Sequence, residues 1–276
     1  MKTQIYDSEL GGYMNYLLSE EKSPATCEKY MRDIRSFYRF SGGRELCKAL
    51  IIEYKNWCIE AGYAPRSVNS MLASINSYLG YIDRQDCKVK SIRLQRKMYC
   101  QDEQELSKQE YRRLLKSAGN RQIRIILQTI CATGIRVSEL KYFTLESVQT
   151  GHVTIRCKGK TRTILIPGKL RTLLLSYAKK HSLCTGPIFL GRKGQPMDRS
   201  CIWRQMKALC AAAGVAAGKV FPHNLRKLFA RTFYEAERDI AGLADLLGHS
   251  NINTTRIYII STGYEHRRRI ERLDLL

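Results

Sequence analysis

Apolar residues recur at intervals of three and four along most of this 276-residue chain, and one segment departs from that spacing. A repeat of this kind predicts amphipathic helices. Between residues 151 and 167, Val153 and Ile155 alternate with polar residues, which instead predicts an antiparallel β-hairpin. Helices are predicted over residues 24–41, 66–82, 107–118, 121–132 and, outside a Gly- and Pro-containing loop at 186–196, most of the chain after 169. The predicted fold class is therefore mainly α with a small antiparallel β-sheet.

Residues 91–105 interrupt the helical spacing and carry mixed charge. We predict that they link a small all-helical domain, residues 1–90, to a second domain with a C-terminal tail, residues 106–276. A chain of this length suits two domains. Ser107, with Glu110 three residues later, matches a capping box, and this motif would begin the first helix of the second domain.

The charge of the chain indicates a polyanionic partner. Its 47 Lys and Arg residues against 25 Asp and Glu residues give a net charge of +22. Residues 1–90 hold 13 basic and 11 acidic residues, whereas residues 91–276 hold 34 and 14, so the excess belongs to the second domain. This bias favours nucleic acid as the partner, with an anionic membrane surface as the alternative.

The ten cysteines predict neither a zinc site nor a disulfide framework. They form no Cys-x-x-Cys pair and no Cys/His cluster with zinc spacing. A conventional core in a chain of this size needs no disulfides. The sequence shows no signal-peptide pattern and no apolar run of about 18 residues. We therefore expect reduced thiols, no metal, no membrane association and a cytoplasmic location at the nucleoid.

One arc of the predicted helix 24–41 is basic. Lys29, Arg32, Arg35 and Arg39 lie on it, away from the apolar face. A stripe of this kind is either a solvated helix face or a surface that follows a phosphate backbone. The sign of the charge makes these four residues candidates for DNA binding.

Two motifs of the second domain contain an arginine at a characteristic position. Arg136 follows Thr133-Gly134, just inside a predicted helix, and Glu139 is one turn further on, where it could hold the guanidinium. His223 and Arg226 are three residues apart at the start of a helix that begins at Pro222, so they share a helix face. We expect this face to differ from the apolar face of the same helix.

Two further motifs bring a lysine, an imidazole and a phenol. Lys158 is at the tip of the predicted hairpin, where Lys160 and Arg162 are rivals for the same role. Gly248-His249 ends one helix, and Tyr258 is expected within the next. Metal-free cleavage of a phosphodiester needs a nucleophile, fixed cations for the pentavalent transition state and a proton donor for the leaving oxygen. The four motifs together contain such groups.

In their order, the four motifs resemble the catalytic signature of the tyrosine recombinase (phage integrase) family, and the size of the chain resembles its simple Xer-like members. Residues 247–258 are similar to the second conserved box of the family almost residue for residue. The resemblance extends over most of the chain. It implies a helical, SAM-like core-binding domain for residues 1–90 and a mixed α/β catalytic domain for residues 106–276, which together form a C-shaped clamp on DNA.

The resemblance implies a role for each motif residue in site-specific recombination. Tyr258 would attack the scissile phosphate to give a 3′-phosphotyrosyl bond, while Arg136 and Arg226 hold the phosphoryl oxygens. A 5′ hydroxyl from a partner strand then reverses the attack, so that neither metal nor other cofactor is needed. The alternatives are a type IB topoisomerase and a catalytically silent DNA-binding protein of the same fold.

The remaining motif residues would handle protons and the phosphate. Lys158 would protonate the leaving 5′ oxygen, His223 would assist proton transfer at the nucleophile, and His249 would hydrogen-bond the phosphate. With Lys160 and Arg162 as further DNA-binding candidates, the hairpin is expected to lie at the DNA. Phe143 and Ser147 depart from the family pattern, and we interpret them as packing and capping changes.

The expected partners are double-stranded DNA and other copies of the chain. The resemblance implies short inverted-repeat sites, a monomer or weak dimer in free solution and a tetramer on paired sites. It leaves open whether the protein serves integration or excision of a mobile element, inversion or dimer resolution.

Overall fold

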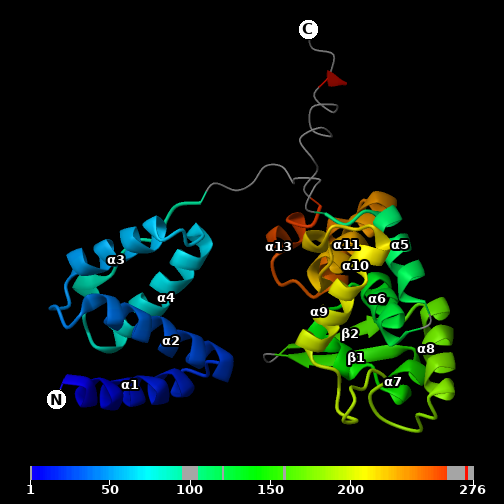
Figure 1. Ribbon diagram of the computed structural model, residues 1–276, viewed down its shortest axis with the longest axis horizontal. Coiled ribbons are helices and arrows are strands. Elements are labelled where there is room, and N and C mark those ends of the chain that lie inside the picture. The colour runs from blue at the N-terminus through cyan, green and yellow to red at the C-terminus, as the bar shows by residue number, and fades with distance from the viewer. Residues whose placement is uncertain (1, 95–104, 120, 158–159, 260–270, 273–276) are drawn as a thin grey trace. The chain divides into compact units, whose positions relative to one another are not determined.

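The computed structural model of the protein describes residues 2–94, 105–119, 121–157, 160–259 and 271–272. The chain divides into two compact units, residues 1–96 and residues 97–276, drawn from blue to cyan and from green to red in Figure 1. Most of the predicted linker, at residues 95–104, lies outside the described residues. Each unit is described separately below.

The first unit is helical. Its elements are α1 (Lys2–Ser19), α2 (Pro24–Ser41), α3 (Lys48–Glu60), α4 (Pro65–Tyr81) and the 3₁₀ turn η1 (Gln85–Cys87). Helices α2 and α4 both contribute to the two apolar clusters of this unit, so they form its centre. The predicted helices 24–41 and 66–82 are confirmed. Ser23 caps α2 by accepting a hydrogen bond from the Thr26 N–H, and Gly42 ends the helix in the left-handed conformation.

The start of the predicted linker is attached to the first unit. The Asn69 side chain of α4 exchanges two hydrogen bonds with the backbone of Ile92, at 2.7 and 2.9 Å, and Asn76 does the same with Val89. These amides satisfy backbone groups of a segment without regular structure. Ile92 also packs against the core of the unit. Ile92, within the predicted linker, is therefore held by α4, which the loss of helical spacing in the sequence did not indicate.

The second unit combines helices with one hairpin. Its elements are α5 (Lys108–Ala118), α6 (Gln122–Thr133), the 3₁₀ helix η3 (Val137–Tyr142), α7 (Leu145–Thr150), β1 (His152–Cys157), β2 (Lys160–Leu165), α8 (Gly168–Lys180), α9 (Arg199–Ala208), α10 (Cys210–Ala213), the 3₁₀ turn η4 (Ala217–Lys219), α11 (Pro222–Glu237), α12 (Ile240–Leu247) and α13 (Ile252–Arg256). The predicted helices 107–118 and 121–132 correspond to α5 and α6. The mainly α fold class is confirmed.

The hairpin is antiparallel, as predicted. Val153 pairs with Ile164 and Ile155 pairs with Arg162. Val153, Ile155 and Ile164 are buried in the large core of the second unit. Because side chains alternate across a strand, Arg162 lies on the same face of the hairpin as Ile164 and points toward the body of the unit.

The departures from the family pattern have the roles expected of them. Phe143 is fully buried in the core of the second unit. Thr144 caps α7 and accepts a hydrogen bond from the Ser147 N–H, while the Ser147 hydroxyl accepts one from the Thr144 N–H. Thus Phe143 packs and Ser147 caps, as the sequence analysis interpreted them.

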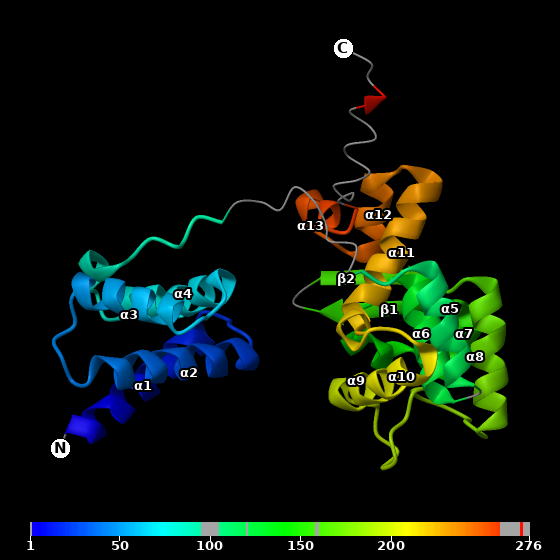
Figure 2. The ribbon, with the colours of Figure 1, turned by 45° about the horizontal axis from the view of Figure 1, so that its top comes forward.

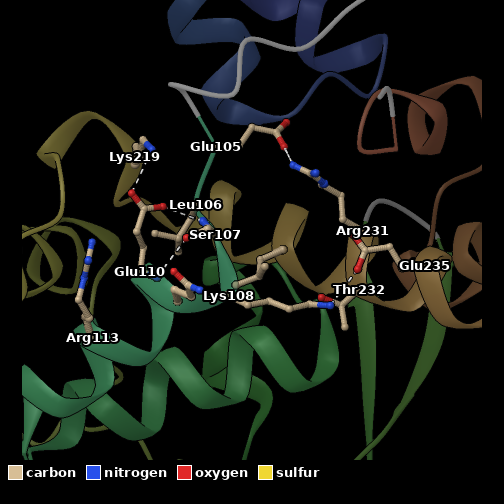
Figure 3. Close-up of a pocket in the computed structure, with 12 residues that line it drawn as sticks. Glu105, Leu106, Ser107, Lys108, Glu110, Arg113, Lys219, Arg231, Thr232 and Glu235 are labelled. Atoms are coloured by element: carbon tan, nitrogen blue, oxygen red, sulfur yellow. Dashed lines mark hydrogen bonds and ion pairs between the residues drawn. The ribbon is translucent and has the colours of Figure 1, made fainter. Parts of the chain in front are cut away.

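Ion pairs attach the first residues of the second unit to α11 and its neighbours. A pocket of about 630 Å³ lies at this place. Lys219 pairs there with Glu110 at 3.0 Å, and Arg231 pairs with Glu105 (Figure 3). Ser107 and Glu110 form the predicted capping box at the start of α5. None of the candidate site residues that the structure describes lines this pocket. Its charges hold the chain as it enters the unit.

No helix in the described part of the chain is both long enough and apolar enough to cross a lipid bilayer.

Gly134 is expected to tolerate no side chain, because two separate constraints meet there. It ends α6 at φ +63°, and a Cβ would overlap the Phe229 ring and come within 3.0 Å of Leu247. Gly134→Ala should lower the free energy of unfolding by about 1–2 kcal/mol for the left-handed backbone and by about 1–3 kcal/mol more for overpacking. The matched control is Gly214→Ala. Gly214 has φ +58°, and a Cβ built on it would meet no atom within 4 Å, so this variant carries the backbone cost alone. Equal losses in urea titrations of the two variants would contradict the packing argument.

Candidate active site

Arg226 lies in the interior of the second unit. It projects from α11 and is 2 % exposed. Its Nη1 donates to the carbonyl of Gly134, and its Nη2 donates to the carbonyl of Leu247 at 2.7 Å. Both carbonyls belong to helix ends, since Gly134 ends α6 and Leu247 is the last residue of α12. Helix C-termini carry partial negative charge, and this charge partly compensates the guanidinium.

This placement corrects the expectation that Arg226 points away from the buried side of its helix. Leu225 and Leu228 are buried, as predicted, but so is Arg226. Phe229 and Phe233 are only partly buried. The carbonyls that accept from the guanidinium come from residues far away in the sequence, so periodicity along α11 does not reveal them.

His249 is held between Arg226 and α13. Its Nε2 is 2.9 Å from Nη2 of Arg226, and its Nδ1 is 2.9 Å from the Thr255 hydroxyl. A guanidinium has only donors, so Nε2 accepts and Nδ1 carries the proton that is donated to Thr255. Gly248, at φ +65°, ends α12 and turns the chain so that His249 faces Arg226.

Tyr258 is in contact with both imidazoles of the site. Its ring centroid is 5.1 Å from that of His223 and 5.4 Å from that of His249. The side chain is 6 % exposed and packs with Ala230, Leu243 and Leu247. Figure 2 shows α12 and α13 side by side next to α11; His223 lies on α11, while His249 and Tyr258 follow α12 and α13. Its hydroxyl also interacts with Arg226. Tyr258 is therefore buried, but it adjoins the arginine.

One detail of the Tyr258 prediction is wrong. The helix α13 ends at Arg256, and Tyr258 lies in the turn that follows, where its N–H donates to the Thr255 carbonyl at 2.9 Å. The segment 252–259 has helical spacing, but the helix is only five residues long. Short helices depend on packing more than on local preference.

Arg136 is the exposed guanidinium of the site. It precedes the 3₁₀ helix η3 in an extended conformation, instead of lying inside an α-helix as predicted. Its Nη1 is 3.1 Å from Oε1 of Glu139, and its backbone N–H donates to Oε2 of the same carboxylate at 2.7 Å. Glu139 thus holds Arg136 as expected. The Arg136 side chain is 46 % exposed, so it remains accessible to a ligand.

Arg162 pairs with the other oxygen of Glu139. Its Nη2 is 2.5 Å from Oε2 of Glu139, and its Nη1 donates to the Leu246 carbonyl at 3.3 Å. The Arg162 side chain is 17 % exposed. The sequence analysis placed Arg162 among the DNA-binding candidates, without any signal that its partner is Glu139, 23 residues earlier.

Cations and burial lower the pKa of the site's basic groups. Burial, then the charges of Arg226 and Arg136, lower the pKa of His249 to about 4. Burial and the nearby charge of Arg136 lower the pKa of Arg226 to about 10. Burial and the charge of Lys227 also lower the pKa of His223. Both imidazoles are therefore neutral near pH 7, and the arginines supply the positive charge.

The remaining candidates differ in what can be said of them. Lys158, at the tip of the hairpin, lies outside the described residues, and Lys160 begins β2. Lys29 forms a 2.8 Å ion pair with the buried Asp33 and donates to Ser74, so its charge is already paired. The arginines of the basic stripe, Arg32, Arg35 and Arg39, are exposed.

The site has no carboxylate partner for Arg226 among the described residues, and the Arg226 Nε is buried there without a hydrogen-bond acceptor. Two guanidiniums, those of Arg136 and Arg162, thus share one carboxylate, Glu139, while the guanidinium of Arg226 has none. Such a site is suited to an anion. No group of three His, Cys, Asp or Glu side chains with metal-binding geometry occurs in the described part of the chain.

Comparison with known proteins gives two family matches. The model described as "Phage integrase family" matches residues 104–263, and the model described as "Phage integrase, N-terminal SAM-like domain" matches residues 10–86. Tyrosine recombinase XerA of Pyrococcus furiosus is 28 % identical over 226 residues, which cover 78 % of this chain and 77 % of that protein. Tyrosine recombinase XerD of Vibrio cholerae is also 28 % identical, over 75 % of this chain and 74 % of its own.

Solved structures show the same fold. A lambda integrase tetramer bound to a Holliday junction aligns with a TM-score of 0.75 at 17 % identity, over 92 % of this chain and 76 % of that chain. XerH site-specific recombinase bound to its difH substrate in a pre-cleavage complex aligns with a TM-score of 0.69 at 20 % identity, over 90 % and 79 % of the two chains.

The depressed pKa of His249 predicts its titration. We expect its NMR signals to titrate with a midpoint near pH 4 in the folded protein. An imidazole in an unfolded chain titrates near pH 6.5, roughly, so protonation favours unfolding. The contribution of neutral His249 to stability is thus present above this pH and lost as the pH falls toward 4. Arg226→Gln, which removes a nearby positive charge, should raise the midpoint, whereas a midpoint of 6.5 or more in the unaltered protein would refute the electrostatic description.

Proposed function

Because this chain belongs to the phage integrase family, we propose that it is a tyrosine recombinase that uses Tyr258 to cut and rejoin duplex DNA at specific sites. The family match extends over 160 residues, which is 104–263, and the SAM-like match adds residues 10–86. The named relatives are tyrosine recombinases that align over about three quarters of their length. The chemistry assigned to individual residues below is our proposal.

The observation that carries the proposal is the buried and only partly compensated charge of Arg226. A buried ion is costly unless it is paired. The partners of this guanidinium are carbonyls and an imidazole, and its Nε has no acceptor within the described part of the chain. A phosphodiester would supply both the missing negative charge and the missing acceptor. The Tyr258 phenol adjoins the same guanidinium.

The proposed reaction exchanges one phosphodiester for another. The Tyr258 oxygen attacks the scissile phosphorus, its proton passes to neutral His223, and the bond from phosphorus to the 5′ oxygen breaks. Lys158 gives a proton to that leaving oxygen, so that a 3′-phosphotyrosyl ester and a free 5′ hydroxyl result. Arg136 and Arg226 hold the non-bridging oxygens throughout, because their charge is already in place when the phosphorane forms. Attack by a partner 5′ hydroxyl reverses each step.

The two units divide the work in this proposal. The helical unit binds DNA, with the exposed arginines of α2 toward the backbone, and the second unit is catalytic. Solved relatives of this fold are described as a dimer and a tetramer on DNA. We propose that this chain acts as a tetramer on paired sites with short inverted repeats, and that it is a monomer or weak dimer when free.

Covalent trapping tests the nucleophile. Adducts captured from fragmented genomic DNA of the source organism, and recovered after denaturation, give the site sequence. On a duplex of that sequence nicked near the cleavage position, the unaltered chain should form a denaturation-resistant adduct. Tyr258→Phe should form none, because it removes one oxygen and leaves the ring contacts with His223 and His249 in place.

Two results would contradict this assignment. An adduct that persists in Tyr258→Phe would mean that another residue is the nucleophile, and Tyr264, which lies outside the described residues, would be tested next. Relaxation of supercoiled DNA that lacks the captured site would favour a topoisomerase. The matched control is Tyr234→Phe, which should form the adduct normally. Tyr234 lies on α11, and the Arg238 guanidinium packs over its ring.

A leaving group that needs no proton tests the role of Lys158. Lys158→Ala should cleave an ordinary duplex about 10²–10⁴ times more slowly, the usual contribution of a general acid. When sulfur replaces the leaving 5′ oxygen, the thiolate departs without protonation, and the variant should cleave nearly as fast as the unaltered chain. Lys160→Ala is the control. If it, and not Lys158→Ala, is rescued by sulfur, the two lysines exchange roles.

A further inference from the structure

Arg162 joins three segments of the proposed active site. It projects from β2 of the hairpin that carries Lys158, its Nη2 pairs with Glu139 of η3, and its Nη1 donates to the Leu246 carbonyl at the end of α12. We propose that Arg162 is a positioning residue for DNA cleavage, which fixes Arg136 through Glu139 and fixes the His249 loop through α12. The inference rests on the proposed recombinase function and assigns to Arg162 a role other than direct DNA binding.

Arg162 balances the charge of the carboxylate that holds Arg136. Glu139 has two guanidinium partners, Arg136 and Arg162, and the three groups together carry one net positive charge. Without Arg162 the carboxylate would cancel the charge of Arg136, the exposed cation that is proposed to hold the phosphate. Arg162 therefore keeps Arg136 electropositive as well as in place. The same charge is felt elsewhere in the site, because Arg162 contributes to the lowered pKa of both His249 and Arg226.

Arg162 also packs against the turn that precedes His249. The Arg162 side chain lies directly on Gly248, where a Cβ would be 2.5 Å from its Cδ and 2.6 Å from its Nη1. Gly248 is the residue that turns the chain from α12 to His249. The absence of a side chain at 248 thus lets the guanidinium reach the end of α12. The stem of Arg162 in turn limits movement of the turn that presents His249.

The terminal nitrogens of Arg162 are occupied by protein acceptors, so the side chain is poorly placed to bind a phosphate directly. Each of its terminal nitrogens already has a protein acceptor, and 17 % of the side chain is exposed. Arg136, in comparison, is 46 % exposed and uses one terminal nitrogen for Glu139. Arg162 therefore acts on the phosphate through other residues.

Cleavage and binding are measured separately to test this. On the captured site, Arg162→Ala should lower the single-turnover rate of adduct formation about 10²-fold, as expected for a small misplacement of catalytic groups. Arg162→Lys should recover roughly tenfold of that loss, since an ammonium neutralises Glu139 but cannot also reach Leu246. DNA affinity and its salt dependence should stay unchanged in both variants. Arg156→Ala, which removes an exposed charge from the adjacent strand, should cleave at the normal rate once bound.

A double-mutant cycle tests the route through Glu139. If Arg162 acts through this carboxylate, Arg162→Ala combined with Glu139→Gln should cleave no more slowly than the slower single variant. Additive losses would overturn that route. A normal cleavage rate in Arg162→Ala would overturn the inference. If that variant also bound DNA more weakly, and the slope of log affinity against log salt concentration were smaller by about one, Arg162 would instead be a phosphate contact.

The variants are interpretable only beside their controls. Thermal melting confirms that each variant is folded, and Arg162→Lys, which keeps the charge and most of the stem, tests the inference if Arg162→Ala does not fold. If the unaltered chain forms no adduct with any DNA, the proposed function fails. If it forms the Tyr258 adduct and Arg162→Ala equals it, the function stands and the inference alone fails.

Discussion

A buried guanidinium, that of Arg226, with no carboxylate partner among the residues that the structure describes is the constraint on which the second unit depends. Arg226 is held by the carbonyls of Gly134 and Leu247, each at the C-terminal end of a helix. Two helix ends bring partial negative charge to the cation, but they do not cancel it. Folding therefore retains a positive charge in a partly desolvated place, where it interacts with an anion more strongly than it would in water. The site is organised before any ligand arrives.

The glycines of two motifs, the one that precedes Arg136 and the one that precedes His249, follow from this arrangement. Gly134 and Gly248 both end helices in the left-handed conformation, which exposes the last carbonyls. Both are also crowded, Gly134 by the Phe229 ring and Gly248 by Arg162. Each glycine thus combines a backbone requirement with a steric one. The ends of α6 and α12, the Arg226 guanidinium between them and the motif residues that follow the two glycines therefore depend on one another.

The sequence predicts the elements of this fold better than the contacts that make its site. Periodicity, capping residues and β-branched alternation identify α2, α4, α5, α6 and the hairpin, because each of these signals is local. The ordered motifs indicate which side chains belong to the site. The burial of Arg226 and the pairing of Arg162 with Glu139 depend on contacts between residues 23 or more positions apart, or on backbone carbonyls, and no spacing rule encodes these. Tyr258 lies outside α13 for a similar reason, since packing determines where so short a helix ends.

The pKa values imply a division of labour between guanidiniums and imidazoles. Near neutral pH, arginines give the site a constant charge, whereas His223 and His249 are neutral and can accept protons. His249 accepts at Nε2 from Arg226 and donates from Nδ1 to Thr255. To donate to a phosphate from Nε2, it would need a second proton or the other tautomer. A bound phosphate favours the protonated form, because an anion stabilises the imidazolium and raises its pKa. In the proposed reaction, binding of the scissile phosphate would therefore itself prepare His249 to hydrogen-bond it.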